Sequence, residues 1–362
     1  MPLAPVPDWV IPAEKALREA VSRVRMIAST TPLDLAVELE RLFLQWQQGQ
    51  PCPPRFSFPA RQNHDEISAS LEHLAAELAP LGPLGAIYAD RAREIAAEAA
   101  ICSAVGSPSL RNHAQKRFSR QDAFDSAADK LAQNWLEEPF HEPELAAHEL
   151  VRSDDPRDPR SLLVRLRAEI GNHKLPFRVV VARDSSALAA TGESFVQIAS
   201  ARFMTVADVE RTVLHEIEGH VVPRCRANAQ RLGIFAIGTR FGVDDQEGRA
   251  LRLERHTGHL QPRRRRELAL RHRAARMLEH HADFVETTRV LLQYGAPLAD
   301  ALRITARIFR GGGLGREIVY LPALLRVDAA LLASPDLDDV LSAGRVSIDA
   351  APLLRPWVEK MH

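Results

Sequence analysis

TVADVERTVLHEIEGHVV, residues 205–222, is the stretch from which the fold and the chemistry of the chain can both be predicted. Thr205, with Asp208 three positions later, is typical of a capping box, in which two side chains satisfy backbone N–H groups at the start of a helix. The apolar residues that follow have the spacing of a buried helix face: Val206, Val209, Val213, Leu214, Ile217 and Val221. The stretch therefore predicts a helix that begins at Thr205 and carries the motif HEIEGH (215–220).

The motif HEIEGH combines two candidate metal ligands with a candidate base. Neutral imidazoles bind zinc, and a carboxylate next to them can take a proton from a metal-bound water. The better-known helix motif has its histidines four residues apart, on one face. Here His215 and His220 are five residues apart, so a regular α-helix would separate their side chains by about 140°. On such a helix the two rings could not share one ion.

A local change of helix geometry would remove this obstacle. At about 4.4 residues per turn, a π-type turn brings the two side chains to within about 50° of each other. Gly219 favours such widening because it has no Cβ. We therefore predict a widened turn between His215 and His220, with a helix end just before His220 as the alternative. If neither occurs, these residues are polar groups on a helix surface with an accidental spacing.

A catalytic zinc site also needs a third protein ligand and one open position. The stretch DDQEGRALRLE supplies four candidates: Asp244, Asp245, Glu247 and Glu254. Glu247 and Glu254 are seven residues apart and can face the same way along a helix. Either can be a ligand while the other orients a histidine. His256 and His259 are weaker candidates, because such a pair on a charged helix is commonly a surface feature.

The remaining sequence predicts a predominantly helical α+β fold with a small sheet. Helices are expected over 31–48, 64–79 and 83–105, and strands over 175–183 and 194–200. Two strands followed by the motif helix is, by analogy, the order found in zincin-like metallopeptidases. We therefore expect an N-terminal helical region, 1–150, packed on a metallopeptidase core, 151–362.

Composition gives no sign of a nucleic-acid or membrane partner. Lys plus Arg equals Asp plus Glu at 47 each, and no run of about eighteen apolar residues occurs. The three scattered cysteines favour a reducing compartment, and the first residues do not have the pattern of a secretory signal. We expect a cytoplasmic protein. The basic run 263–278 is interpreted as a solvated helix face, with a patch for acidic substrates as the alternative.

HEIEGH (215–220) and QEG (246–248), in this order, resemble the QEGLA-motif family, which includes the microtubule-associated tyrosine carboxypeptidases. Further similar stretches extend the likeness over most of the chain: 31–43, 54–58, 175–193 and 307–321. The resemblance implies zinc as cofactor, His215, His220 and Glu247 as its ligands, and Glu216 as the general base.

The sequence departs from the family pattern at several positions around these motifs. The family reads HEIGTH, where this chain has Glu218 and Gly219, and Arg249 replaces the Leu of QEGLA. Arg316 and Glu317 replace a Lys-Asp pair while keeping both charges. All four metal-site residues are retained, so we expect the departures to affect substrate preference more than activity.

These observations predict a zinc metallopeptidase that removes a residue from the C-terminus of a peptide or protein. Binding a terminal carboxylate requires a cation, and Arg307 and Arg310 beside the Gly-rich turn are the candidates. Tyr320 is a candidate donor to the developing oxyanion. Two alternatives remain, an endopeptidase and a regulatory or peptide-binding protein that keeps its zinc site without turnover. The sequence does not predict an oligomeric state.

Overall fold

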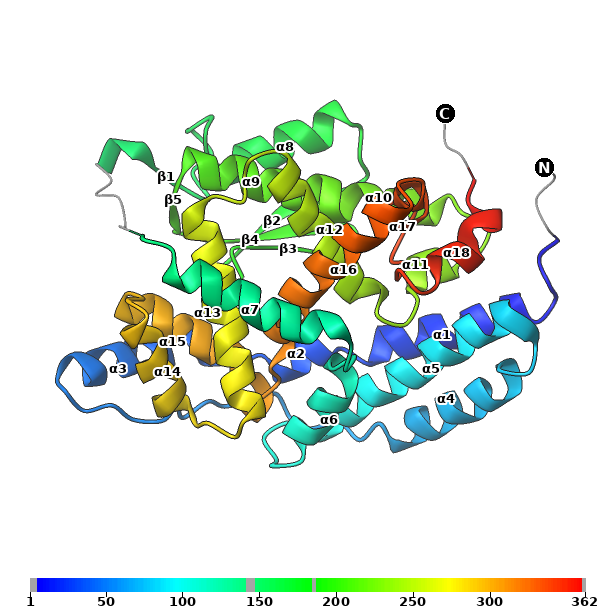
Figure 1. The fold of residues 1–362 in the computed structure, drawn as a ribbon, viewed down its shortest axis with the longest axis horizontal. Helices are drawn as coiled ribbons and strands as arrows, with labels where there is room; N and C mark the ends of the chain where they lie inside the picture. Colours follow the sequence, from blue (N-terminus) through cyan, green and yellow to red (C-terminus); the bar gives the residue numbers. More distant parts are fainter. Residues whose placement is uncertain (1–4, 141–146, 184–186, 360–362) are drawn as a thin grey trace. The chain divides into compact units, whose positions relative to one another are not determined.

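The computed structural model describes residues 5–140, 147–183 and 187–359, and within these ranges the chain is predominantly helical with two small sheets (Figure 1). The predicted α+β class is confirmed. No helix in the described ranges combines the length and the apolar character that a membrane crossing requires.

Segments that are distant in sequence combine into two compact units. The main segments of the first unit are Pro139–Arg264 and Ala323–His362, and those of the second are Pro7–Glu138 and Arg265–Pro322. The predicted boundary at residue 150, between an N-terminal helical region and a metallopeptidase core, stays a prediction.

The second unit consists of helices, which lie in its two sequence segments. Those of the first segment are α1 (Val10–Arg23), α2 (Met26–Thr30), α3 (Leu35–Gln47), α4 (Asp65–Leu78), α5 (Gly82–Ser103), α6 (Leu110–Phe118) and α7 (Ala123–Glu137). The second segment holds most of α13 (Pro262–Glu279), then α14 (Phe284–Gln293), α15 (Leu298–Ile308), the 3₁₀ turns η3 (Arg310–Gly312) and η4 (Arg316–Val319), and the start of α16 (Tyr320–Ala333). Helices α3, α4 and α5 confirm the three predicted near the N-terminus. The first of them starts later than expected because the Thr31 hydroxyl donates to Ile27 O at 2.6 Å and closes α2.

The first unit contains both sheets and the motif helix. Its strands are β1 (Leu150–Arg152), β2 (Arg178–Ala182), β3 (Ala189–Thr191), β4 (Phe195–Ala199) and β5 (Phe203–Thr205). Its other elements are η1 (Ala147–Glu149), α8 (Leu162–Asn172), α9 (Val206–Glu216), the π-helical turn η2 (Ile217–Val221), α10 (Val222–Asn228), α11 (Ile234–Ile237), α12 (Gly242–His256), α17 (Leu337–Leu341), α18 (Ala351–Leu354) and η5 (Arg355–Trp357), with the rest of α16. The predicted strands 175–183 and 194–200 correspond to β2 and β4.

The three-stranded sheet has the order β2-β4-β3 and supports the motif helix. β4 pairs in parallel with β2, where Val179 lies opposite Val196, and antiparallel with β3, where Ala190 lies opposite Gln197. Val196 and Ile198 of β4 are fully buried in a core formed with α8 and α9. Because α9 is fixed on this core, its C-terminal end is held beside β3.

The basic run forms most of α13, and its solvated-face interpretation is wrong for several of its arginines. The side chains of Arg264, Arg271 and Arg276 are 9%, 15% and 20% exposed. Each forms ion pairs with carboxylates, which allows a guanidinium to be buried at a tolerable cost.

Candidate metal centre

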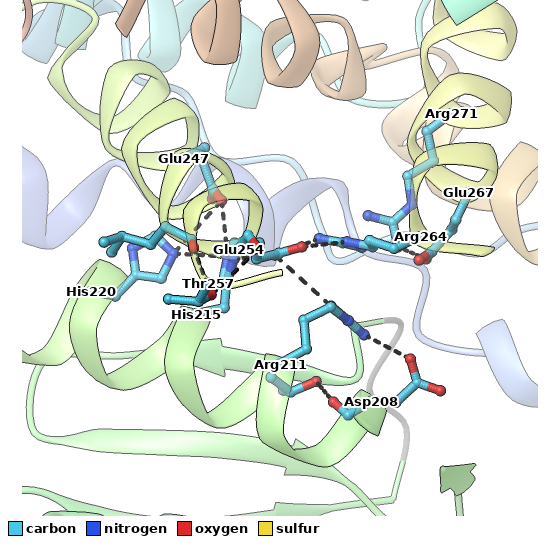
Figure 2. A network of polar contacts seen from close by, with 12 residues as sticks. Asp208, Arg211, His215, His220, Glu247, Glu254, Thr257, Arg264, Glu267 and Arg271 are labelled. Carbon is cyan, nitrogen blue, oxygen red and sulfur yellow. Dashed lines mark hydrogen bonds and ion pairs between the residues drawn. The ribbon is translucent and has the colours of Figure 1, made fainter. Parts of the chain in front are cut away.

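The motif helix begins and widens as the sequence predicts. The Thr205 hydroxyl accepts from the Asp208 backbone N–H at 3.1 Å and donates to the Asp208 carboxylate at 3.0 Å, so the capping box is confirmed. Helix α9 ends at Glu216, and Ile217–Val221 form the π-helical turn before α10 continues. The predicted widening between His215 and His220 is therefore confirmed. It places both rings on the same side of the helix (Figure 2).

Three donor atoms converge at this turn. The Nε2 atoms of His215 and His220 are 3.3 Å apart, and Glu247 Oε2 lies 3.5 Å from the first and 3.6 Å from the second. Zinc–ligand bonds of about 2.0–2.1 Å in a tetrahedral site place neighbouring donors about 3.4 Å apart. Among the described residues, these three form the group that could hold a metal ion. Their spacing fits three corners of a zinc tetrahedron.

The other ring nitrogens of both histidines face hydrogen-bond acceptors. His215 Nδ1 lies 2.7 Å from Glu254 Oε1, and His220 Nδ1 lies 3.2 Å from Gln246 Oε1. A carboxylate and an amide oxygen accept, so each Nδ1 donates, and the neutral form of each ring then has its Nε2 lone pair directed to the shared point. A cation at this point can bind both Nε2 atoms, which are 3.3 Å apart, once neither carries a hydrogen. The residues present thus fit a metal ion.

Charges around the group favour a cation at the same place. Burial acts to lower the pKa of His215, but its contacts with Glu247 and Glu254 outweigh burial and raise that pKa to about 9. Burial likewise acts to raise the pKa of Glu254, but the positive charge of Arg264 and the contact with His215 hold it at about 2. The two carboxylates therefore create a negative potential, which favours a proton or a divalent cation at this point.

Glycines in both motifs allow the helices to approach closely enough for this geometry. A Cβ on Gly219 would lie 2.7 Å from Ala250 Cβ on α12. A Cβ on Gly248 would lie 2.4 Å from backbone atoms of Ala323 on α16. Neither distance is compatible with a real side chain unless the backbone shifts. Gly219 thus does more than permit the π-turn, because it lets the turn contact the helix that carries Glu247.

We expect Gly219→Ala to lower the free energy of unfolding by about 1–3 kcal/mol, the usual cost of overpacking a tight contact. The matched control is Gly171→Ala in α8, where a new Cβ would meet no atom within 4 Å. That change should raise stability by about 0.4–1 kcal/mol, since alanine has less conformational freedom in the unfolded chain. Denaturant unfolding of both variants checks this, and equal effects would contradict it.

The glutamate of the motif is held by Thr191, a residue outside the HEIEGH and QEG motifs. Glu216 is 5% exposed, and its Oε2 accepts a hydrogen bond from Thr191 Oγ1 at 2.7 Å. Thr191 ends β3, an edge strand of the three-stranded sheet. The stretch AATGE around it lies in a turn-rich part of the sequence, so its composition gave no signal. Only the tertiary contact between β3 and α9 identifies it.

Of the candidates for the third ligand, Glu247 is part of the donor group. Glu254 instead accepts a hydrogen bond from His215 Nδ1, on the far side of the ring from the donor group. Asp245 instead accepts from Arg326 at 3.0 Å and from the Ile348 N–H at 2.9 Å. His256 and His259 are outside the donor group. The sequence did not lead us to predict Gln246 as the hydrogen-bond partner of His220. Its position next to Glu247 in QEG could have indicated this role.

The two candidate carboxylate-binding arginines and the candidate oxyanion donor Tyr320 belong to the second unit, where they lie around Glu317. Arg307 donates to Glu317 at 2.6 Å and to the Tyr320 hydroxyl at 3.3 Å. Burial, reinforced by the charge of Arg307, lowers the pKa of the Arg310 guanidinium to about 9. Glu317 and Tyr320 are 2% and 6% exposed. The structure therefore brings Arg310 and Tyr320, both buried, together with the half-buried Arg307, and the roles of these residues in the reaction stay predictions.

Fold and site together define an α+β protein with a candidate three-ligand metal centre. The family model of the microtubule-associated tyrosine carboxypeptidases matches residues 43–361, so the chain belongs to this family. The structure is also similar to that of a candidate lipoprotein from Colwellia psychrerythraea, with a TM-score of 0.51 and 12% identity over 94% of this chain and 76% of that chain. At this identity the likeness shows the fold alone. No curated protein matches the sequence.

Proposed function

We propose that the chain is a zinc-dependent carboxypeptidase with a zincin-like core. The observation that carries the proposal is the convergence of His215 Nε2, His220 Nε2 and Glu247 Oε2 on one point, with Glu216 next to the first ligand. Three protein ligands leave a fourth position open, which is typical of catalytic rather than structural zinc sites. Membership of a carboxypeptidase family supports the same reaction class.

Bound zinc would supply a Lewis acid that polarises a carbonyl and acidifies water. The protein residues carry out the remaining steps. Glu216 accepts the proton of the attacking water on its carboxylate and passes it to the leaving amine. Thr191 holds this carboxylate through Oε2, which leaves Oε1 to act. Gln246 and Glu254 orient the two histidines.

For the substrate, we propose that Arg307 and Arg310 bind the terminal carboxylate and that Tyr320 donates to the oxyanion. Arginine suits this task because its planar fork matches both oxygens of a carboxylate. Arg307 donates to the Tyr320 hydroxyl at 3.3 Å, and this neighbourhood of the proposed carboxylate and oxyanion contacts supports the assignment. The partner is accordingly the C-terminus of a peptide or protein.

A peptide panel separates this proposal from its rivals. Peptides with free and with amidated C-termini are incubated with zinc-loaded protein, with chelated protein and with protein to which zinc has been returned, then analysed by mass spectrometry. A carboxypeptidase shortens free peptides by one residue, spares amidated ones and depends on zinc. Internal cleavage of amidated peptides would indicate an endopeptidase. Zinc binding without any product would favour a regulatory or peptide-binding protein.

We expect Thr191→Val to lower kcat by about 10-fold with little change in KM or zinc content, because the base loses its orientation but remains present. Thr191→Ser keeps the hydroxyl and should retain most of the activity. Steady-state kinetics on the peptide that the panel identifies checks this pair. Equal kcat values for the two variants would show that the hydrogen bond to Glu216 is unimportant.

A further inference from the structure

Arg264, in the basic run 263–278, contacts the carboxylate behind the metal centre. Its Nε donates to Glu254 Oε2 at 3.0 Å and its Nη2 donates to Glu254 Oε1 at 3.2 Å (Figure 2). The contact is two-pointed, the geometry in which arginine binds a carboxylate most strongly. Arg264 therefore differs from its neighbour Arg263, which pairs with Asp208 and is 49% exposed.

The Glu254 side chain depends on such a partner. It is 0% exposed, and a carboxylate removed from water is strongly disfavoured unless it is paired and hydrogen-bonded. Arg211 Nη1 lies 3.9 Å from Glu254 Oε1, at the limit of an ion pair. The Nε and Nη2 atoms of Arg264 lie 3.0 Å and 3.2 Å from the Glu254 oxygens, so Arg264 is the closer cation. Arg264 thus holds the carboxylate in place through both of its oxygens.

The direction of each hydrogen bond follows from these contacts. The N–H groups of arginine only donate, so both oxygens of Glu254 act as acceptors toward Arg264. Glu254 Oε1 then also accepts from His215 Nδ1, at 2.7 Å. In the neutral ring with its hydrogen on Nδ1, the Nε2 of His215 is unprotonated and can bind a metal. Without an acceptor at Nδ1, nothing in this contact keeps the hydrogen off Nε2, where it would block the ligand atom.

We propose that Arg264 is a positioning residue of the metal centre. Its two-point contact with Glu254 holds His215 in the tautomer and orientation whose Nε2 binds the metal. The inference rests on the proposed zinc site and adds to it a residue from α13. It also gives the basic run a role in the chemistry of the chain.

The test is zinc affinity, which requires no substrate. Zinc is titrated into metal-free full-length protein in competition with a chromophoric chelator, for wild type and for Arg264→Met, Arg264→Lys and Arg263→Met. Partners of metal ligands commonly contribute about 10- to 100-fold in affinity. Arg264 acts through such a partner, so Arg264→Met should bind zinc about 10-fold more weakly, at the low end of this range. Arg264→Lys, which keeps the charge but not the fork, should fall between it and wild type. Arg263→Met, the matched control on the same helix, should match wild type.

Circular dichroism and thermal unfolding of the metal-free proteins separate lost affinity from lost fold. Wild-type affinity in a folded Arg264→Met chain overturns the inference while leaving the zinc site intact. If Arg264→Met does not fold, wild-type affinity in Arg264→Lys overturns it in the same way. A wild-type protein that takes up no zinc removes the metal centre itself, and the inference falls with it.

Discussion

Glu216→Gln should reduce kcat by about 10²- to 10⁴-fold, the usual effect of removing a general base. Glutamine keeps the shape of the side chain and an oxygen that can still accept from Thr191, so the local structure should be preserved. What it lacks is the ability to take the proton of the attacking water. Zinc content and KM should therefore stay close to the wild-type values while turnover is lost.

The control for this variant lies two residues away. Glu218→Gln makes the same chemical change in the same motif, but this side chain is not part of the donor group. Its kcat should remain near wild type. Kinetics on the peptide identified by mass spectrometry, with zinc measured by elemental analysis, compares the pair. Wild-type turnover in the Glu216 variant would remove this residue from the mechanism.

His215→Ala and Glu247→Ala should each weaken zinc binding by more than about 100-fold, beyond the effect of losing an outer partner. A site with three protein ligands has no spare donor, and each of these residues supplies one converging atom. Activity should fall with the zinc content and return only partly when zinc is added in excess.

His256→Ala is the matched control for the histidine variant, because it removes an imidazole outside the donor group. It should keep one zinc per chain and wild-type turnover. Elemental analysis after purification without added metal, followed by chelator competition, measures all three variants. Full zinc retention in both ligand variants would contradict the assigned site.

The sequence was most informative where local geometry restricts the alternatives. Two histidines five residues apart can share an ion only if the helix widens or ends, and Gly219 between them favoured widening. The structure has the π-turn at Ile217–Val221. Likewise, a spacing of seven residues predicted that Glu247 and Glu254 face the same way along α12. It could not tell which one is the ligand, because that depends on how α12 packs against α9.

Features that depend on tertiary packing were not predictable from the sequence. The strand β3 is three residues long and follows a turn-rich stretch, so its pattern gave no strand signal. Its last residue, Thr191, nevertheless contacts the proposed base. In the same way, the composition of the basic run favoured a solvated face. Arg264 is buried because it pairs with Glu254, and the sequence alone does not show that the fold brings these two residues together.

Anomalous diffraction at the zinc edge, from crystals of the zinc-loaded protein, tests the central claim most directly. It locates the ion without reference to activity or substrate. The account predicts one zinc about 2.0–2.2 Å from His215 Nε2, His220 Nε2 and a carboxylate oxygen of Glu247. An ion that contacts one histidine but not the other, or no anomalous peak at the π-turn despite saturating zinc, would contradict it.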